Sequence, residues 1–234
     1  MDLSALSLTV RYEGNAPGER ALDALSDLTV RFRAGERVAI CGGPGSGKTT
    51  LLKTLAALRR PHAGEVRWDE SDPWALPPEE RRARQAAFGM VFQTDALFDA
   101  ETVRDNVLLP LLRRGVPRDE AETRAIESLR AVGLEDAADL LPSALSGGMQ
   151  KRAGIARAIV ARPEVLLADD PLAGLDPSTA SQVAKLLWRE SEGRTLIVAM
   201  PDPVRWLRAE RWLLLERGRI AYDGPFDAGR LERE

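Results

Sequence analysis

The chain of 234 residues has one cysteine, one histidine and no surplus of basic residues. The lone Cys41 excludes a disulfide framework and suits a reducing compartment, where its simplest role is that of a small buried residue. The net charge of -3 excludes the basic footprint that nucleic-acid-binding proteins carry, so we expect no nucleic-acid partner.

Long apolar runs are also lacking. No stretch approaches the roughly 20 residues that a membrane-spanning helix needs. Residues 1–4 lack the basic and apolar regions of a signal peptide. We therefore expect a cytoplasmic protein, which leaves room for docking on a membrane partner.

A glycine-rich segment at residues 42–49 fits the pattern G-x-x-x-x-G-K-[ST], in which backbone N–H groups surround nucleotide phosphates. It follows an apolar run and precedes a helical pattern, the context that this motif requires. Lys48 would neutralise the β- and γ-phosphates, and the Thr49 hydroxyl would ligate Mg²⁺. The predicted nucleotide contacts here are Gly42, Gly43, Pro44, Gly45, Ser46, Gly47, Lys48, Thr49 and Thr50.

A second glycine-rich segment, Leu-Ser-Gly-Gly-Met at residues 145–149, also precedes a helical pattern. The start of a helix favours anions through its N–H groups and its dipole. Ser146, Gly147 and Gly148 would form an anion nest, but no second Lys-Thr pair accompanies them. Such a nest makes sense as half of a site that another subunit completes, and a two-fold interface would create two composite sites.

The apolar run 165–168 ends in two acids, Asp169 and Asp170. Open α/β sheets bind ligands at the carboxyl ends of their strands. With the phosphate loop upstream, Asp169 is placed to hold Mg²⁺, and Asp170 to orient or deprotonate an attacking water.

Strand-like and helical patterns alternate at both ends of the chain, whereas the middle is helical. A mostly parallel sheet with an inserted all-helical lobe follows from this order. A polar turn is expected around residues 15–18. Strands are predicted in 3–12, 26–41, 64–68, 88–93, 165–169, 195–199, 211–216 and 219–222, and helices at 102–112, 118–132, 148–161 and 178–190.

This pattern resembles the nucleotide-binding subunit of an ABC (ATP-binding cassette) transporter over nearly the full chain. Residues 145–150 are similar to the family's signature loop, with Met in place of Gln. Gln93 matches the Q-loop glutamine, which contacts Mg²⁺ and senses the membrane partner. Residues 174–177 match the D-loop, and Tyr12 lies where the family stacks an aromatic ring on adenine.

The resemblance implies a P-loop NTPase fold of the ABC ATPase type, with a mostly parallel core sheet, an antiparallel β subdomain and an inserted helical subdomain. Residues 1–234 would form one domain: a catalytic core from 1–92 and 163–234, and the Q-loop and helical subdomain in about 93–162. ATP and Mg²⁺ would be its cofactors. The catalytic residues would be Lys48, Gln93 and Asp170, and the metal ligands would be Thr49, Gln93 and Asp169.

Two positions depart from the family's pattern, because Asp170 stands where the family has Glu and Pro201 where it has His. The shorter carboxylate would lie about an ångström farther from the water, and such a misplacement can lower a rate about 10²-fold. Pro201 has no side-chain donor for the γ-phosphate. We predict firm ATP binding with slow hydrolysis at this chain's own site. The chain would either pair with a different ATPase subunit that supplies an active site, or pair with itself and turn over slowly or use another base. An ATP-dependent scaffold is the non-enzymatic alternative.

Residues 92–107 and 142–153 are similar to stretches of Mla-type, MCE-associated lipid-transport ATPases. The ABC family resemblance implies a head-to-tail dimer with a second ATPase subunit, identical or different. The Mla-type similarity implies that a permease holds this dimer on the cytoplasmic face of the membrane, with an MCE-domain protein as a further partner. The cargo would be phospholipid or a related molecule, and import of another small solute is the alternative. Candidate permease contacts, which could instead pack inside the helical lobe, are Leu97, Phe98, Leu108 and Leu109.

Overall fold

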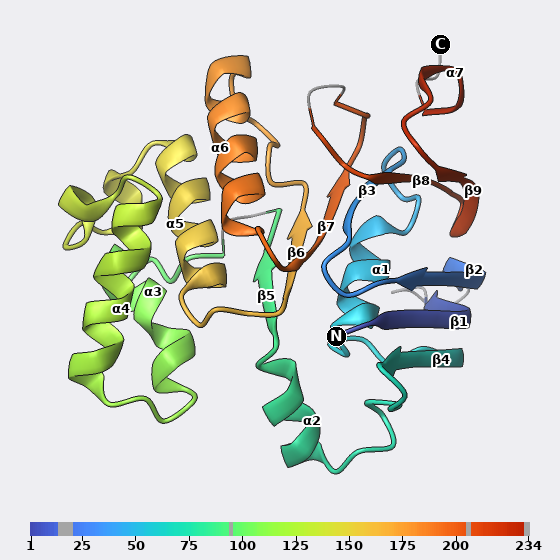
Figure 1. Cartoon of the computed structure of the whole chain (residues 1–234), viewed down its shortest axis with the longest axis horizontal. Coiled ribbons are helices and arrows are strands. Elements are labelled where there is room, and N and C mark those ends of the chain that lie inside the picture. Colours follow the sequence, from blue (N-terminus) through green and yellow to red (C-terminus); the bar gives the residue numbers. More distant parts are fainter. Residues whose placement is uncertain (14–20, 94–95, 205–206, 232–234) are drawn as a thin grey trace. The chain divides into compact units, whose positions relative to one another are not determined.

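The structure is a computed structural model, whose helices and strands are labelled in Figure 1. The contacts between its residues separate two compact units. The first, which contains the phosphate-loop motif, comprises residues 1–85 and 195–234 and is called the phosphate-loop unit. The second, residues 86–194, is called the helical unit. The turn predicted at 15–18 lies outside the described residues, which are 1–13, 21–93, 96–204 and 207–231.

The phosphate-loop unit contains the predicted antiparallel subdomain, a three-stranded sheet with the order β2-β1-β4. Apolar residues alternate along β1, so one face of the sheet is buried. At Ser7, φ is +48°, and the pairing with β2 shifts its register here, which keeps both Ala5 and Leu8 on the buried face. The strands are β1 (Leu3–Tyr12), β2 (Leu22–Phe32) and β4 (Ala63–Trp68).

A parallel group of strands completes this unit. Strand β3 pairs in parallel with β7 on one side and β8 on the other, and β9 pairs antiparallel with β8. Helix α1 contacts β7 and all three strands of the antiparallel sheet, which buries Leu51, Leu52 and Leu55. The elements are β3 (Arg37–Cys41), α1 (Lys48–Leu55), α2 (Pro78–Gln85), β7 (Thr195–Met200), β8 (Arg211–Glu216), β9 (Arg219–Gly224) and α7 (Ala228–Leu231).

The apolar segment predicted at 26–41 resolves into two strands, β2 and β3, which belong to different sheets. Between them the chain turns at residues 33–36, where the amide of Glu36 donates to the carbonyl of Arg33 (3.0 Å) and Gly35 has φ +79°. Thr195 fixes this turn to the start of β7, because its hydroxyl accepts the amide hydrogen of Gly35 (2.9 Å).

In the helical unit, α3, α4 and α5 pack side by side, as predicted (Figure 1). Strands β5 and β6 pair in parallel, and α5 lies close to β5, since a side chain at Gly89 would come within 2.3 Å of the Ala158 carbonyl. No helix among the described residues is long and apolar enough to cross a bilayer. The elements are β5 (Phe88–Val91), α3 (Val103–Leu112), α4 (Arg118–Ala131), η1 (Glu135–Ala137), η2 (Pro142–Ala144), α5 (Gly147–Ile159), β6 (Val165–Asp169) and α6 (Pro177–Glu190).

The segment that leads into α3 is organised by Asn106, a polar side chain that is only 1% exposed. Its amide oxygen accepts the N–H of Phe98 (2.7 Å), and its amide nitrogen lies 3.0–3.2 Å from the carbonyls of Phe98, Glu101 and Thr102. A buried polar group that is hydrogen-bonded in this way stabilises the loop, whereas its removal leaves several backbone groups without partners.

We expect Asn106→Ala to lower the free energy of unfolding by about 1–3 kcal/mol, because buried backbone groups lose their partner. Urea denaturation measures the loss, and hydrogen exchange at the Phe98 amide should accelerate. The control is Asp99→Ala, at an exposed position of the same loop, which should stay within about 0.5 kcal/mol of the parent. Equal stability of the two variants would contradict this account of the loop.

Candidate nucleotide-binding site

The phosphate loop connects β3 to α1 and lies against backbone at two of its glycines. Gly42 has φ +150°, and a Cβ there would lie 2.2 Å from the carbonyl oxygen of Leu215 in β8. Gly47, the N-cap of α1, has φ +105°, and its Cβ would lie 2.3 Å from the Ala24 carbonyl oxygen in β2. The loop can approach these strands so closely only because both positions lack a side chain.

Lys48 reaches back over the loop. Its ammonium group donates to the carbonyls of Gly42 and Gly43 (3.0 Å to the latter) and lies 3.3 Å from the Ser46 hydroxyl oxygen. A helix start with a lysine ammonium beside it is a donor set that suits a polyphosphate. The loop therefore fits the phosphates that the motif predicted.

Tyr12, the predicted adenine-stacking residue, is the last residue of β1, and its side chain keeps 39% of its surface exposed. Its hydroxyl lies 3.3 Å from the hydroxyl of Thr50, in the first turn of α1. The structure thus brings the aromatic ring and the helix of the phosphate loop together within one unit, although 38 residues separate them in sequence.

Pro201 follows β7 and touches the loop through its backbone, because its carbonyl accepts the amide hydrogen of Gly42 (3.2 Å). Its ring has no donor for a phosphate. Cys41, at the end of β3, is buried as predicted, and this burial raises the pKa of its thiol to about 12. A thiol that stays protonated at neutral pH is a packing residue and not a nucleophile.

The two predicted acids stand at the end of β6 in the helical unit. Asp169 is 4% exposed, and Asp170 adopts a left-handed conformation with φ +45°. The side-chain amide of Gln93 lies 3.5 Å from a carboxylate oxygen of Asp170. Gln93 is itself fixed by Lys151 of α5, whose ammonium donates to the backbone carbonyl of Gln93. The sequence analysis missed Lys151, a buried lysine without a motif to mark it.

The predicted metal ligands are hydroxyl, amide and carboxylate oxygens, which are the hard donors that Mg²⁺ prefers. Thr49 belongs to the phosphate-loop unit, whereas Gln93 and Asp169 belong to the helical unit. Their chemistry fits this cation, which would supply positive charge against the phosphate oxygens when bound.

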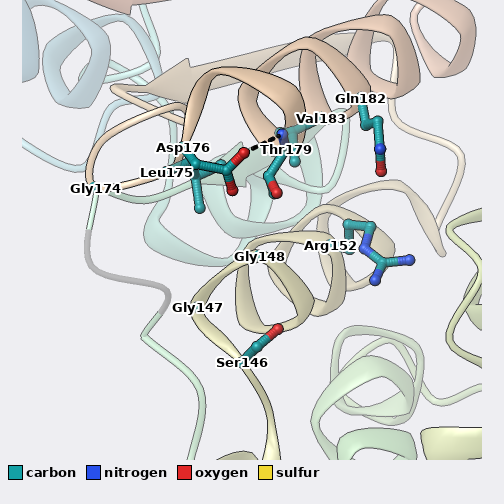
Figure 2. A pocket seen from close by; sticks show the side chains of 10 residues that line it. All are labelled: Ser146, Gly147, Gly148, Arg152, Gly174, Leu175, Asp176, Thr179, Gln182 and Val183. Atoms are coloured by element: carbon teal, nitrogen blue, oxygen red, sulfur yellow. Dashed lines mark hydrogen bonds between the residues drawn. The ribbon is translucent and has the colours of Figure 1, made fainter.

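The signature and D-loop segments line one hollow of about 310 Å³ in the helical unit (Figure 2). Ser146 caps α5, and its hydroxyl accepts the Met149 amide hydrogen (3.3 Å). The N-cap residues of two helices, α5 and α6, line this hollow. None of its lining residues is a lysine. The lining residues are Ser146, Gly147, Gly148, Arg152, Gly174, Leu175, Asp176, Thr179, Gln182 and Val183.

Asp176 of the D-loop caps α6 and holds the rim of this hollow (Figure 2). Its carboxylate accepts the amide hydrogens of Ser178 (3.0 Å) and Thr179 (3.1 Å). Hydrogen bonds from the Thr179 side chain and from these amides lower the pKa of Asp176. Gly148 packs so closely on this helix start that a Cβ would lie 2.6 Å from the methyl carbon of Thr179.

The chain belongs to the ABC transporter family, because the sequence profile of that family matches residues 25–173. The match contains the phosphate loop, the signature segment and the two acids. The fold agrees, since the chain resembles a dimeric ATP-binding cassette, MJ0796, in a post-hydrolysis state bound to ADP and Pi. This comparison has a TM-score of 0.86 and 32% identity, and it covers 96% of this chain and 99% of that one.

Curated relatives include the methionine import ATP-binding protein MetN 1 of Rhodococcus jostii (strain RHA1), 37% identical over 94% of this chain and 65% of the relative. Another is the MetN protein of Myxococcus xanthus (strain DK1622), 40% identical over 88% of this chain and 64% of the relative. The chain thus spans slightly less than two thirds of the length of these relatives.

The two glycines Gly47 and Gly43 give a direct test of the loop geometry. We expect Gly47→Ala to destabilise the protein by about 2 kcal/mol or more, because a strained φ adds to a clash with the Ala24 carbonyl. Gly43→Ala should be tolerated, since a Cβ there meets nothing within 4 Å and φ is not left-handed. Thermal or urea unfolding of both variants measures this; equal losses would contradict the predicted close approach.

Proposed function

We propose that this chain is an ATP-binding and ATP-hydrolysing subunit that powers a membrane permease. One observation carries the proposal: a lysine-bearing phosphate loop and a lysine-free anion hollow occur in the same chain. The hollow has a helix start but no lysine, so two subunits arranged head to tail, each with its hollow on the partner's phosphate loop, would complete two sites. The MJ0796 cassette, which is dimeric when bound to ADP and Pi, supports the pairing of two such subunits.

Within such a site, each predicted residue takes the role that the family resemblance implies. Lys48 and the amides of the loop hold the phosphates, and Tyr12 stacks on the base. Asp169, buried at the end of β6, holds the cation. Gln93 and Asp170, which lie together, orient the attacking water, and Asp170 accepts its proton. The partner's hollow contacts the γ-phosphate from the other side.

Hydrolysis at this site is proposed to be slow. Asp170 places its carboxylate one methylene short of a glutamate, and Pro201 reaches the loop only through its carbonyl. Both changes affect the transition state more than the binding of ATP, so the rate constant should fall while affinity is kept. A degenerate subunit that pairs with a different, active ATPase is the second candidate, because its own signature hollow is intact.

We expect Asp170→Glu to raise kcat by about 10²-fold with little change in KM, because the longer side chain brings the base closer to the water. Phosphate release by the purified protein with Mg-ATP measures the change. Asp170→Asn is the control, which should keep ATP binding and lose the remaining hydrolysis. A parent protein that already hydrolyses ATP as fast as Asp170→Glu would refute the impaired site.

The permease is proposed to dock in a groove of about 380 Å³ on the helical unit. Its floor includes three of the four predicted contacts, Phe98, Leu108 and Leu109, together with Leu112. Phe98 is 49% exposed, so its ring is accessible to a partner. Leu108 is buried, so Phe98 and Leu109 are the predicted contacts in this groove whose side chains are accessible.

We expect Phe98→Asp to release the subunit from native membranes while leaving ATP affinity unchanged, because a carboxylate would replace the apolar ring that is proposed to be buried by the permease. Sedimentation with membranes and nucleotide titration measure the two effects. The control is Leu22→Asp, which places the same charge on a 66% exposed leucine of β2. Retained membrane association of Phe98→Asp would exclude this groove as the docking site.

The relatives favour a small solute as the cargo and import as the direction, since MetN proteins are named for methionine import. The phospholipid cargo and the MCE-domain partner inferred from residues 92–107 and 142–153 rest on sequence resemblance alone. Transport assays with the cognate permease, comparing methionine with phospholipid, separate the two cargoes.

A further inference from the structure

The exposed ring of Tyr12 has a cation on one side. The guanidinium carbon of Arg59 lies 4.3 Å from the centroid of the ring. A terminal nitrogen of the same guanidinium donates to the carbonyl of Arg11 (3.0 Å), the residue before the tyrosine. Arg59 therefore holds both the ring and the backbone that carries it.

The turn after α1 places Arg59 at this position. Ala57 adopts φ +52°, and the amides of Leu58 and Arg59 both donate to the carbonyl of Lys53 (2.8 and 3.2 Å). This closes the end of the helix and leaves Arg59 half-buried, whereas its neighbour Arg60 is exposed. The backbone that carries the Arg59 side chain is thus fixed by a folded turn.

The end of β1 is fixed from other directions as well. The amide of Arg11 donates to Nδ1 of His62 (3.0 Å), and the amide of His62 donates to the carbonyl of Thr9 (2.8 Å). The hydroxyl of Tyr12 is held near Thr50. A ring immobilised in this way loses little conformational entropy when a base stacks on it.

We propose that Arg59 is a positioning residue for the nucleotide base, acting through Tyr12 to form a stack of guanidinium, phenol ring and purine. The inference rests on the proposed stacking of adenine on Tyr12. Arginine interacts favourably with an aromatic face, and a ring held in place offers its other face to a base. Arg59 follows α1, whose eight residues span about 12 Å. Its effect should therefore fall on the base and not on the phosphates at Lys48.

The test compares ATP with ribose 5′-triphosphate, which has the same phosphates but no base. Isothermal titration of the full chain in Mg²⁺ gives the two Kd values. The Kd of ribose 5′-triphosphate divided by the Kd of ATP is the ratio that measures the contribution of the base. Arg59→Ala should lower this ratio about threefold, as loss of an exposed cation–π contact implies, and leave the Kd of ribose triphosphate unchanged. Arg59→Lys, which keeps the charge but not the planar group, should lower it less.

Two further variants make the test specific. Arg60→Ala removes the neighbouring guanidinium, which lies 5.8 Å from the centroid of Trp74 instead of Tyr12, and should leave the ratio unchanged. Tyr12→Ala should lower the ratio further than Arg59→Ala, because it removes the stacking surface itself.

The outcomes separate this inference from the function on which it rests. If Tyr12→Ala lowers the ratio but Arg59→Ala does not, the role of Arg59 is overturned and the stacking stands. An equal loss for both ligands in Arg59→Ala and Arg59→Lys would show that Arg59 only stabilises the fold, which also overturns the inference. A parent chain that binds neither ligand would overturn the proposed function as well.

Discussion

The close approach of the phosphate loop to two strands is the constraint on which the phosphate-loop unit depends. Gly42 and Gly47 lie against the carbonyls of Leu215 and Ala24, so the loop is packed between β8 and β2. Gly218 strengthens this packing, because its amide donates to the Ser46 carbonyl (3.0 Å). A loop packed on both sides keeps one conformation, and the donors at the start of α1 are therefore in place before any phosphate arrives.

The same helix connects the phosphate loop to the ring of Tyr12. Its first turn holds the hydroxyl of Tyr12 through Thr50, and the turn that closes it holds the ring through Arg59. The phosphate loop and the ring of Tyr12 thus share one short element, α1. A helix packed on strands of both sheets moves little, so the distance between the loop and the ring is set by the core and not by flexible loops.

Much of this arrangement could be predicted from the sequence, because it depends on local patterns. The helices at 103–112, 118–131 and 147–159 follow from the apolar period, and the phosphate loop follows from its motif. The break between β2 and β3 was missed, although Arg33, Gly35 and Glu36 interrupt the apolar pattern between the two strands. Contacts between distant residues left no local signal, and so Lys151 beside Gln93 was missed.

The replacement at Asp170 agrees with the backbone that carries it. At φ +45°, aspartate is tolerated better than most side chains, because its short polar group can hydrogen-bond locally. A glutamate here would carry some conformational strain, which a site can support when catalysis gains from it. Under the proposed function, the signature hollow keeps Ser146, Gly147 and Gly148, whereas the side chain of Asp170 is one methylene shorter than a glutamate. The two halves of the composite site would then be unequal, which would be most useful in a dimer whose other subunit differs, because this hollow would serve a glutamate on the partner.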